Sequence, residues 1–262
     1  MNLLEVGESK RRGRKLTMVT CYDSWSAKIL AETPVDMILV GDSASMVMHG
    51  HDDTLPASMD MMELHVKAVR RGAPAKFIVG DLPFLSFRMG LESNVDNVRR
   101  LIQAGAHAVK LEGYDESNAE LIRHLTRSGI PVMGHVGLTP QFVHAFGGFR
   151  VQGRDENQQR RILEQARGLE EAGCFSVVLE CVPGPLAAEI TSTLQIPTIG
   201  IGAGSLCDGQ VLVLHDLLGL TTGFRPKFVR SYMNGAEQIR AAVESYCRDV
   251  EGGRFPGPEE TY

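Results

Sequence analysis

At Ile38-Leu39-Val40-Gly41-Asp42-Ser43 a short apolar run stops at a carboxylate, and a similar arrangement returns four times along the chain. Each later copy places an ionisable residue at the end of a run rich in Val, Ile, Leu or Met. The copies are Phe77-Ile78-Val79-Gly80-Asp81, Ala108-Val109-Lys110-Leu111-Glu112, Val132-Met133-Gly134-His135 and Val177-Val178-Leu179-Glu180. Runs of this length and composition are typical of strands buried on both faces. We therefore expect residues with catalytic or metal-binding potential at one end of successive strands.

Helical segments separate these runs, and several of them end at glycine, as where Met62, Val66 and Val69 hold helical spacing before Gly72. Eight strands are predicted, at residues 16–20, 36–40, 76–80, 107–111, 130–134, 175–179, 197–201 and 211–214. Eight short buried strands that alternate with helices favour a closed (βα)8 barrel over an open doubly wound sheet. The longest irregular segment, 136 to about 153, is expected to form a cover over a site.

A single domain is expected, because 262 residues are a usual length for one closed α/β barrel. Its bounds are residues 1–262. The basic run at Arg11, Arg12, Arg14 and Lys15 is interpreted as part of a solvated N-terminal arm over about residues 1–15. The Gly- and Pro-rich end, about residues 252–262, is interpreted as an extended peripheral tail.

Charge and composition argue against several classes of function. The net charge of −5 provides no broad basic surface for nucleic acid. No apolar run reaches the roughly 18 residues of a membrane span, and the first residues lack a signal region, so we expect a cytoplasmic protein without a membrane partner. The five cysteines lack CxxC spacing, which predicts buried free thiols rather than disulfides or a zinc site.

In a barrel the carboxyl ends of all strands face one mouth, where active sites are built. Six side chains are predicted to meet there: Asp42, Asp81, Lys110, Glu112, His135 and Glu180. Several carboxylates in one partly desolvated site repel one another, so a bound cation is expected to neutralise them. Oxygen ligands without cysteine favour Mg2+ over Zn2+. Taken singly, an Asp after a strand is more often a helix cap or turn residue, and only the repetition favours a site.

Other features are given structural interpretations. His49 and His51 are interpreted as a solvated pair in a polar loop rather than metal ligands. The glycines of Gly200-Ile201-Gly202-Ala203-Gly204 are explained by close backbone approach rather than by nucleotide binding, because the loop lacks the third glycine of GxGxxG. Ser43 has no GxSxG elbow, so it is expected to hold a substrate carboxylate rather than act as a nucleophile.

Eight short motifs in order make the chain resemble the ketopantoate hydroxymethyltransferase family over about residues 17–232. They are Val40-Gly41-Asp42-Ser43, Thr54-Leu55-Pro56, Asp81-Leu82-Pro83-Phe84, Val109-Lys110-Leu111-Glu112-Gly113, Gly134-His135-Val136-Gly137-Leu138-Thr139-Pro140-Gln141, Leu179-Glu180-Cys181-Val182-Pro183, Ile196-Pro197-Thr198-Ile199-Gly200-Ile201-Gly202-Ala203-Gly204 and Cys207-Asp208-Gly209-Gln210. The resemblance implies a (βα)8 TIM barrel of the phosphoenolpyruvate mutase and isocitrate lyase type, assembled as a homo-decamer.

The activity implied by the resemblance is transfer of a hydroxymethyl group from 5,10-methylenetetrahydrofolate to 3-methyl-2-oxobutanoate, giving 2-dehydropantoate in pantothenate biosynthesis. The resemblance also implies roles for residues. Asp42 and Asp81 would be Mg2+ ligands, and Glu112 would reach the ion, directly or through water. Ser43 and Lys110 would bind the substrate carboxylate, His135 would line the pocket, and Glu180 would be the base. The two ligand aspartates would thereby contact the substrate as well.

The chain departs from the family pattern at Ala44, Ser45 and Tyr114, and also in the tail and in residues 85–90. No residue with an implied chemical role is lost, but the departures concern the shape of the pocket. Two alternatives follow: a related Mg2+-dependent lyase or aldolase acting on another 2-oxo acid, and a catalytically silent barrel used as a binding module.

Overall fold

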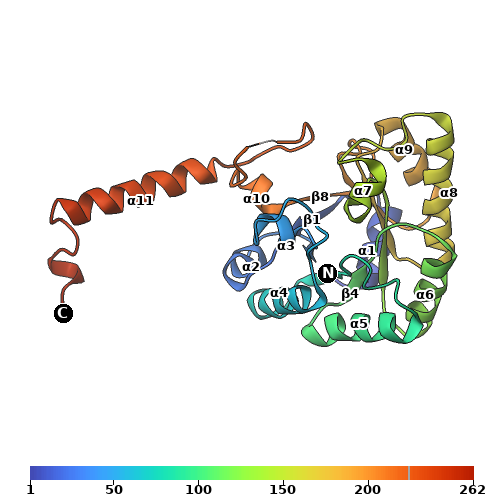
Figure 1. Cartoon of the computed structure of the whole chain (residues 1–262), viewed down its shortest axis with the longest axis horizontal. Helices are drawn as coiled ribbons and strands as arrows, with labels where there is room; N and C mark the ends of the chain where they lie inside the picture. Colours follow the sequence, from blue (N-terminus) through green and yellow to red (C-terminus); the bar gives the residue numbers. More distant parts are fainter. Residues whose placement is uncertain (224) are drawn as a thin grey trace. The chain divides into compact units, whose positions relative to one another are not determined.

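The computed structural model describes residues 1–223 and 225–262, which divide into two compact units, Met1–Leu212 and Val213–Tyr262. The first unit is a closed barrel of eight parallel strands in sequential order, with β8 hydrogen-bonded to β1 (Figure 1). Its strands are β1 Leu16–Thr20, β2 Met37–Val40, β3 Phe77–Asp81, β4 Ala108–Lys110, β5 Val132–Gly137, β6 Ser176–Glu180, β7 Thr198–Ile201 and β8 Gly209–Leu212. The predicted barrel is confirmed, with strand ends displaced by at most three residues.

Helices surround this barrel, and most follow the strands as a βα pattern requires (Figure 1). They are α1 Leu3–Arg11, α2 Ser24–Ala31, α3 Ala44–Val47, α4 Met59–Gly72, α5 Leu91–Ala104, α6 Glu116–Arg127, α7 Val143–Phe146, α8 Glu156–Ala172 and α9 Gly184–Thr193, with the 3-10 helix η1 Pro140–Phe142. Side-chain caps begin several of them: Asp115 accepts from the backbone N–H of Asn118, and Asp155 from that of Gln158. These caps satisfy backbone donors that would otherwise remain unpaired at the helix starts.

The barrel interior is filled by alternate residues of the strands. One buried cluster holds Met18 of β1, Leu39 of β2, Val79 of β3 and Val178 of β6. Because side chains alternate across a strand, residues two positions further along each strand point into the same interior. This alternation decides which polar residues face the mouth.

Residues 1–15 are not a solvated arm throughout: Arg11, Arg12, Arg14 and Lys15 are exposed as expected, but Leu3–Arg11 form the helix α1. Asn2 caps α1 in a capping box with Glu5, and Val6 is fully buried in the same cluster as Leu16 and Met18. The apolar side chain of Val6 therefore closes one end of the barrel interior. Its burial stabilises α1, a helix that was not predicted because the basic run suggested a solvated segment. Arg14 pairs with Asp36 at 2.9 Å on the same side.

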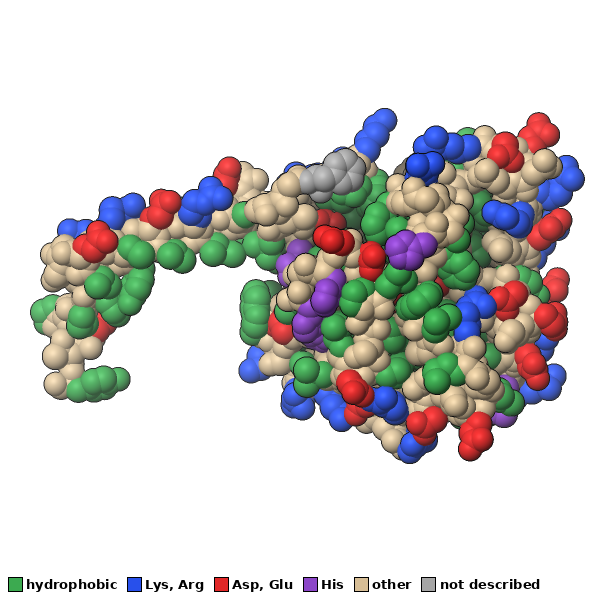
Figure 2. Space-filling model, in the orientation of Figure 1, with side chains coloured by type: hydrophobic (Ala, Val, Ile, Leu, Met, Phe, Trp, Pro, Cys, Tyr) green, Lys and Arg blue, Asp and Glu red, His purple; other side chains and the backbone are tan. Residues whose placement is uncertain are grey.

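The second unit contains α10 Leu214–Leu217, the long helix α11 Gly235–Glu251 and the 3-10 helix η2 Pro258–Glu260. Four apolar side chains on α11 are about half exposed: Ile239, Val243, Tyr246 and Val250. Their spacing of three and four residues places them on one face of the helix, visible as a continuous row in Figure 2. Exposed apolar faces of this kind mark contact surfaces.

Candidate functional site

Four neighbouring strands deliver ionisable side chains to the barrel mouth. Asp81 lies two residues beyond the core residue Val79, Lys110 two beyond Ala108, His135 two beyond Met133 and Glu180 two beyond Val178. The alternation of a strand therefore directs all four toward the barrel interior. Asp81 and Lys110 are also register partners in the β3–β4 pair. The sequence prediction that these residues converge at the carboxyl ends of the strands is consistent with this register.

Asp81 and Lys110 form a buried ion pair. The Nζ atom of Lys110 lies 2.7 Å from each carboxylate oxygen of Asp81, and both side chains are almost fully excluded from solvent. The backbone N–H of Asp42 donates to Oδ2 of Asp81 at 3.2 Å, which joins the ends of β2 and β3. Asp42 and Asp81 thus lie side by side although 39 positions separate them in the sequence.

Gln141 connects Asp42 with Glu112 and was missed by sequence reasoning. Its side-chain Nε2 donates to Oδ2 of Asp42 and to the carbonyl oxygen of Leu82, each at 2.9 Å. Its backbone N–H donates to Oε2 of Glu112 at 3.0 Å. Gln141 is buried, so this part of the segment expected to cover the site forms part of its wall. The only sequence signal was its place in the motif Leu138-Thr139-Pro140-Gln141.

His135 lies between two glutamates. Its Nδ1 is 3.3 Å from Oε1 of Glu112, and its Nε2 is 3.3 Å from Oε2 of Glu180. These are ion-pair contacts rather than well-aligned hydrogen bonds, because among the described residues neither ring nitrogen has a hydrogen-bond partner of good geometry. Burial lowers the pKa of His135, but Glu112 and Glu180 outweigh burial and raise it to about 9. The imidazolium thus bridges the inner Glu112 and the partly exposed Glu180.

Around Asp42 and Asp81 the negative charge of the carboxylates exceeds the positive charge of the nearby cations. Burial, with Asp81 and Glu112 as negative neighbours, raises the pKa of Asp42 well above its usual range. Burial likewise raises the pKa of Asp81, although Lys110 opposes this effect. Burial also favours a raised pKa for Glu112, but Lys110 and His135 prevail and lower it. Further positive charge is therefore most strongly favoured between Asp42 and Asp81.

The donor set fits a hard divalent cation. Among the hydrogen bonds of the described residues Oδ1 of Asp42 receives none, whereas both oxygens of Asp81 accept from Lys110. Asp42 therefore offers an oxygen directly, and Asp81 would share its oxygens between Lys110 and the cation. No group of three His, Cys, Asp or Glu side chains close enough to hold a metal alone occurs in residues 1–223 and 225–262. A Mg2+ ion needs only one or two protein carboxylates, since water and substrate complete its shell. Glu112 is engaged by Gln141 and His135, and its Oε1 lies 3.6 Å from Nζ of Lys110.

Ser43 lies at the start of α3, next to Asp42. Its Oγ is 2.8 Å from the phenol oxygen of Tyr22. A side chain at position 41 would place its Cβ 2.9 Å from that Oγ, so the glycine there leaves room for the hydroxyl. His49 is exposed yet not merely solvated: its Nε2 lies 2.9 Å from Nε2 of His65. The five cysteines are free thiols, as predicted, but only Cys21, Cys174 and Cys207 are buried, whereas Cys181 is half-buried and Cys247 is exposed.

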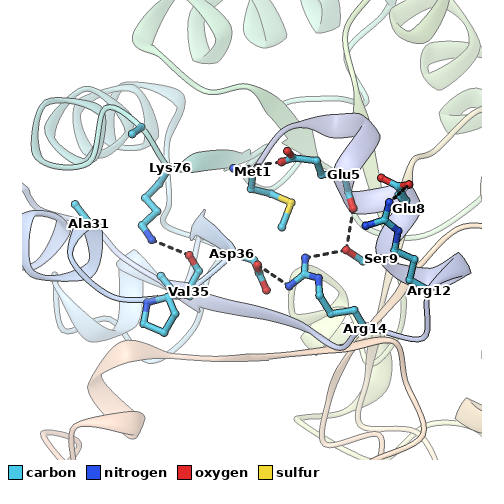
Figure 3. A pocket seen from close by; sticks show the side chains of 12 residues that line it. Met1, Glu5, Glu8, Ser9, Arg12, Arg14, Ala31, Val35, Asp36 and Lys76 are labelled. Atoms are coloured by element: carbon cyan, nitrogen blue, oxygen red, sulfur yellow. Dashed lines mark hydrogen bonds and ion pairs between the residues drawn. The ribbon is translucent and has the colours of Figure 1, made fainter.

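A cavity lies away from these residues. Figure 3 shows a cavity of about 490 Å3 lined by α1 and by the segments that enter β2 and β3, at the amino ends of the strands. Its charged groups bind one another, as where Arg14 meets Asp36 and Lys76 donates to the carbonyl of Val35 at 2.9 Å. None of the candidate residues lines it. Groups at this end of a barrel serve stability rather than chemistry.

Comparison with known proteins gives one consistent result. Residues 1–258 match the family model described as ketopantoate hydroxymethyltransferase. A 3-methyl-2-oxobutanoate hydroxymethyltransferase of Bdellovibrio bacteriovorus is 54% identical over 99% of this chain and 98% of its own length. Proteins of the same name from Coxiella burnetii and Legionella pneumophila are each 50% identical, over 98% and 100% of this chain and 96% and 100% of their own lengths.

Solved structures share the fold at low identity. A putative phosphonomutase from Burkholderia cenocepacia superposes with a TM-score of 0.68 at 15% identity, covering 93% of this chain and 98% of that one. A 2,3-dimethylmalate lyase described as a PEP mutase/isocitrate lyase superfamily member has a TM-score of 0.65 at 15% identity, covering 99% and 91%. These likenesses confirm the predicted fold type.

Proposed function

This chain belongs to the ketopantoate hydroxymethyltransferase family, and from that premise we propose how its barrel mouth performs the family's reaction. The chain is a hydroxymethyltransferase acting on 3-methyl-2-oxobutanoate, in pantothenate synthesis. We propose 5,10-methylenetetrahydrofolate as the one-carbon donor. With one water the reaction balances: C3 of the oxo acid loses a proton and gains a hydroxymethyl group, and tetrahydrofolate leaves.

Asp42 and Asp81 are proposed to hold Mg2+, with Glu112 reaching the ion through water. When bound, Mg2+ would stabilise the negative charge that develops on the keto oxygen as C3 is deprotonated. Lys110, held against Asp81, and Ser43, at the start of α3, would bind the substrate carboxylate. Charge-assisted contacts of this kind would orient C3 for proton removal.

Glu180 is proposed to take the proton from C3. Its side chain is partly exposed at the end of β6, whereas Asp81, Lys110 and Glu112 are almost fully buried. The contact with His135 would hold the Glu180 carboxylate in one orientation. After Glu180 has removed the proton, C3 of the enolate would attack the one-carbon unit. His135 is thus proposed to line the pocket and position the base.

The observation that carries this assignment is the arrangement of two adjacent buried aspartates with Lys110, while His135 links the same cluster to Glu180. Purified protein is expected to form 2-dehydropantoate from the oxo acid, the folate donor and Mg2+. EDTA should abolish the product, and added Mg2+ should restore it, because the oxo acid needs the cation to stabilise its enolate. Product formation unaffected by EDTA would contradict the Mg2+ proposal. Cleavage of a 2-oxo acid without folate would instead indicate a lyase.

We propose further that the chain works in the cytoplasm as a homo-oligomer, a decamer as the family resemblance implies. Among the described residues no helix is long and apolar enough to cross a membrane. The exposed apolar row on α11 supports a contact between copies of the chain, because water contact with four large side chains is costly.

Val243→Glu is expected to lower the molar mass of the assembly, since it buries a charge in the proposed contact. Light scattering after gel filtration measures this mass. Ala241→Glu is the matched control, because it adds the same charge on the opposite face of α11, where it should leave the mass unchanged. Equal masses for Val243→Glu and the unmodified protein would show that the row lies outside the subunit contacts.

A further inference from the structure

Tyr22 is a buried tyrosine whose hydroxyl reaches the candidate site. It follows β1 by two residues and is 1% exposed. Its phenol oxygen lies 2.8 Å from Oγ of Ser43, and Thr20 is a second hydrogen-bonding neighbour of the phenol. No chemical role had been assigned to this side chain. Because Ser43 is proposed to bind the substrate, a buried hydroxyl beside it determines the direction in which Ser43 donates its proton.

His65 and His49 connect the backbone segments that carry Tyr22 and Ser43. Nδ1 of His65 on α4 lies 2.6 Å from the backbone carbonyl oxygen of Tyr22, and a carbonyl only accepts, so Nδ1 carries the hydrogen. Burial lowers the pKa of His65, which favours the neutral ring and leaves Nε2 as an acceptor. His49 then donates to it at 2.9 Å. His49 follows α3, the helix that begins directly after Ser43, so these contacts connect the segment of Ser43 back to the segment of Tyr22.

We propose that Tyr22 is a positioning residue that fixes the hydroxyl of Ser43 as a hydrogen-bond donor toward the carboxylate of the oxo acid. The inference rests on the role of Ser43 given under the proposed function. Tyr22 itself need not touch the substrate.

The direction of the hydrogen bonds follows from counting protons. An ionised carboxylate can only accept hydrogen bonds, so the hydroxyl of Ser43 must donate its single proton to the substrate. Thr20, the other neighbour of the phenol, can donate its own hydroxyl proton to the phenol oxygen, so the phenol of Tyr22 donates its single proton to Oγ of Ser43. Burial raises the pKa of Tyr22, so the phenol keeps the proton it has to give. Without that donor the serine hydroxyl would be free to turn among its three staggered positions and to point away from the substrate.

A double-mutant cycle tests this coupling. The dissociation constant for 3-methyl-2-oxobutanoate is measured by titration with Mg2+ present, for Tyr22→Phe, Ser43→Ala and the double variant. Ser43→Ala should raise the constant about 10-fold, as expected for a bond to a charged group, and Tyr22→Phe about 5-fold. In the Ser43→Ala background, Tyr22→Phe should add less than about 2-fold, because its effect acts through Ser43.

Tyr114→Phe is the matched control. Tyr114 is one of the departures from the family pattern that were expected to shape the pocket, but it is half-buried with its ring against Gly168 of α8, so losing this hydroxyl should leave the dissociation constant unchanged. Both Tyr22→Phe and Ser43→Ala keep the shape of the side chain almost intact, and melting temperatures report whether each variant is folded. A full 5-fold effect of Tyr22→Phe in the Ser43→Ala background, or no effect of it alone, would overturn the role of Tyr22 only. An unchanged constant in Ser43→Ala would overturn the role of Ser43, and the inference with it.

Discussion

Glu180→Gln is expected to reduce deuterium exchange at C3 of 3-methyl-2-oxobutanoate by about 10^3-fold, within the range typical of a lost general base. Glutamine keeps the size of the side chain and its place at the end of β6, but its amide accepts no proton at neutral pH. Exchange is followed by NMR in deuterated water with Mg2+ and without the folate donor, so that only proton removal is observed.

Binding separates this explanation from a general loss of structure. The dissociation constant of the oxo acid in the presence of Mg2+ should change only a few-fold in Glu180→Gln, because Asp42, Asp81 and Lys110 are untouched. Glu189→Gln on α9 is the control, since Glu189 is exposed. Exchange at the normal rate in Glu180→Gln would remove Glu180 as the base and would require another proton acceptor near C3.

Asp81→Asn is expected to have two large effects with separate causes. The first is on stability: Lys110 is nearly fully buried, and Asp81 is the carboxylate closest to its ammonium group. Removing one partner of such a pair leaves a buried charge without compensation and costs about 3 kcal/mol of the free energy of unfolding. Denaturant unfolding without metal measures this effect.

The second effect of Asp81→Asn is on ligand binding. The amide oxygen is a weaker ligand for Mg2+ than the carboxylate, so Mg2+-dependent binding of the oxo acid should weaken by about 100-fold, near 3 kcal/mol. Titration is carried out at a temperature where unfolding curves show the variant to be folded. Asp96→Asn, an exposed position on α5, is the matched control. An unchanged titration curve for Asp81→Asn would contradict its ligand role, whatever the effect on stability.

The barrel itself was predictable because its evidence is local. Short runs such as residues 37–40 and 77–81 are apolar throughout, and parallel strands buried on both faces require this composition. The mouth residues were predictable for a related reason: the carboxyl ends of parallel strands meet at one rim, whatever their separation in sequence. Asp42 and Asp81 could therefore be paired before any coordinate was known.

Contacts made by loops were not predictable in this way. Gln141 reaches Asp42 across 99 positions, and no periodicity connects them. The basic run near Arg11 suggested a solvated arm, but Val6 on the same helix is fully buried inside the barrel. In both cases burial depends on which surface a segment meets, and a polar or charged neighbourhood in the sequence does not reveal that surface.

The sequence by itself determined the strands, their order, the end at which chemistry takes place and the family to which the chain belongs. Only the tertiary structure decided which side chains touch: Gln141 between Asp42 and Glu112, His135 between Glu112 and Glu180, and Tyr22 against Ser43. The physical reason is the range of the forces. Apolar periodicity is set between neighbours in the chain, whereas hydrogen bonds and buried charges depend on distances of a few ångströms between segments that only folding brings together.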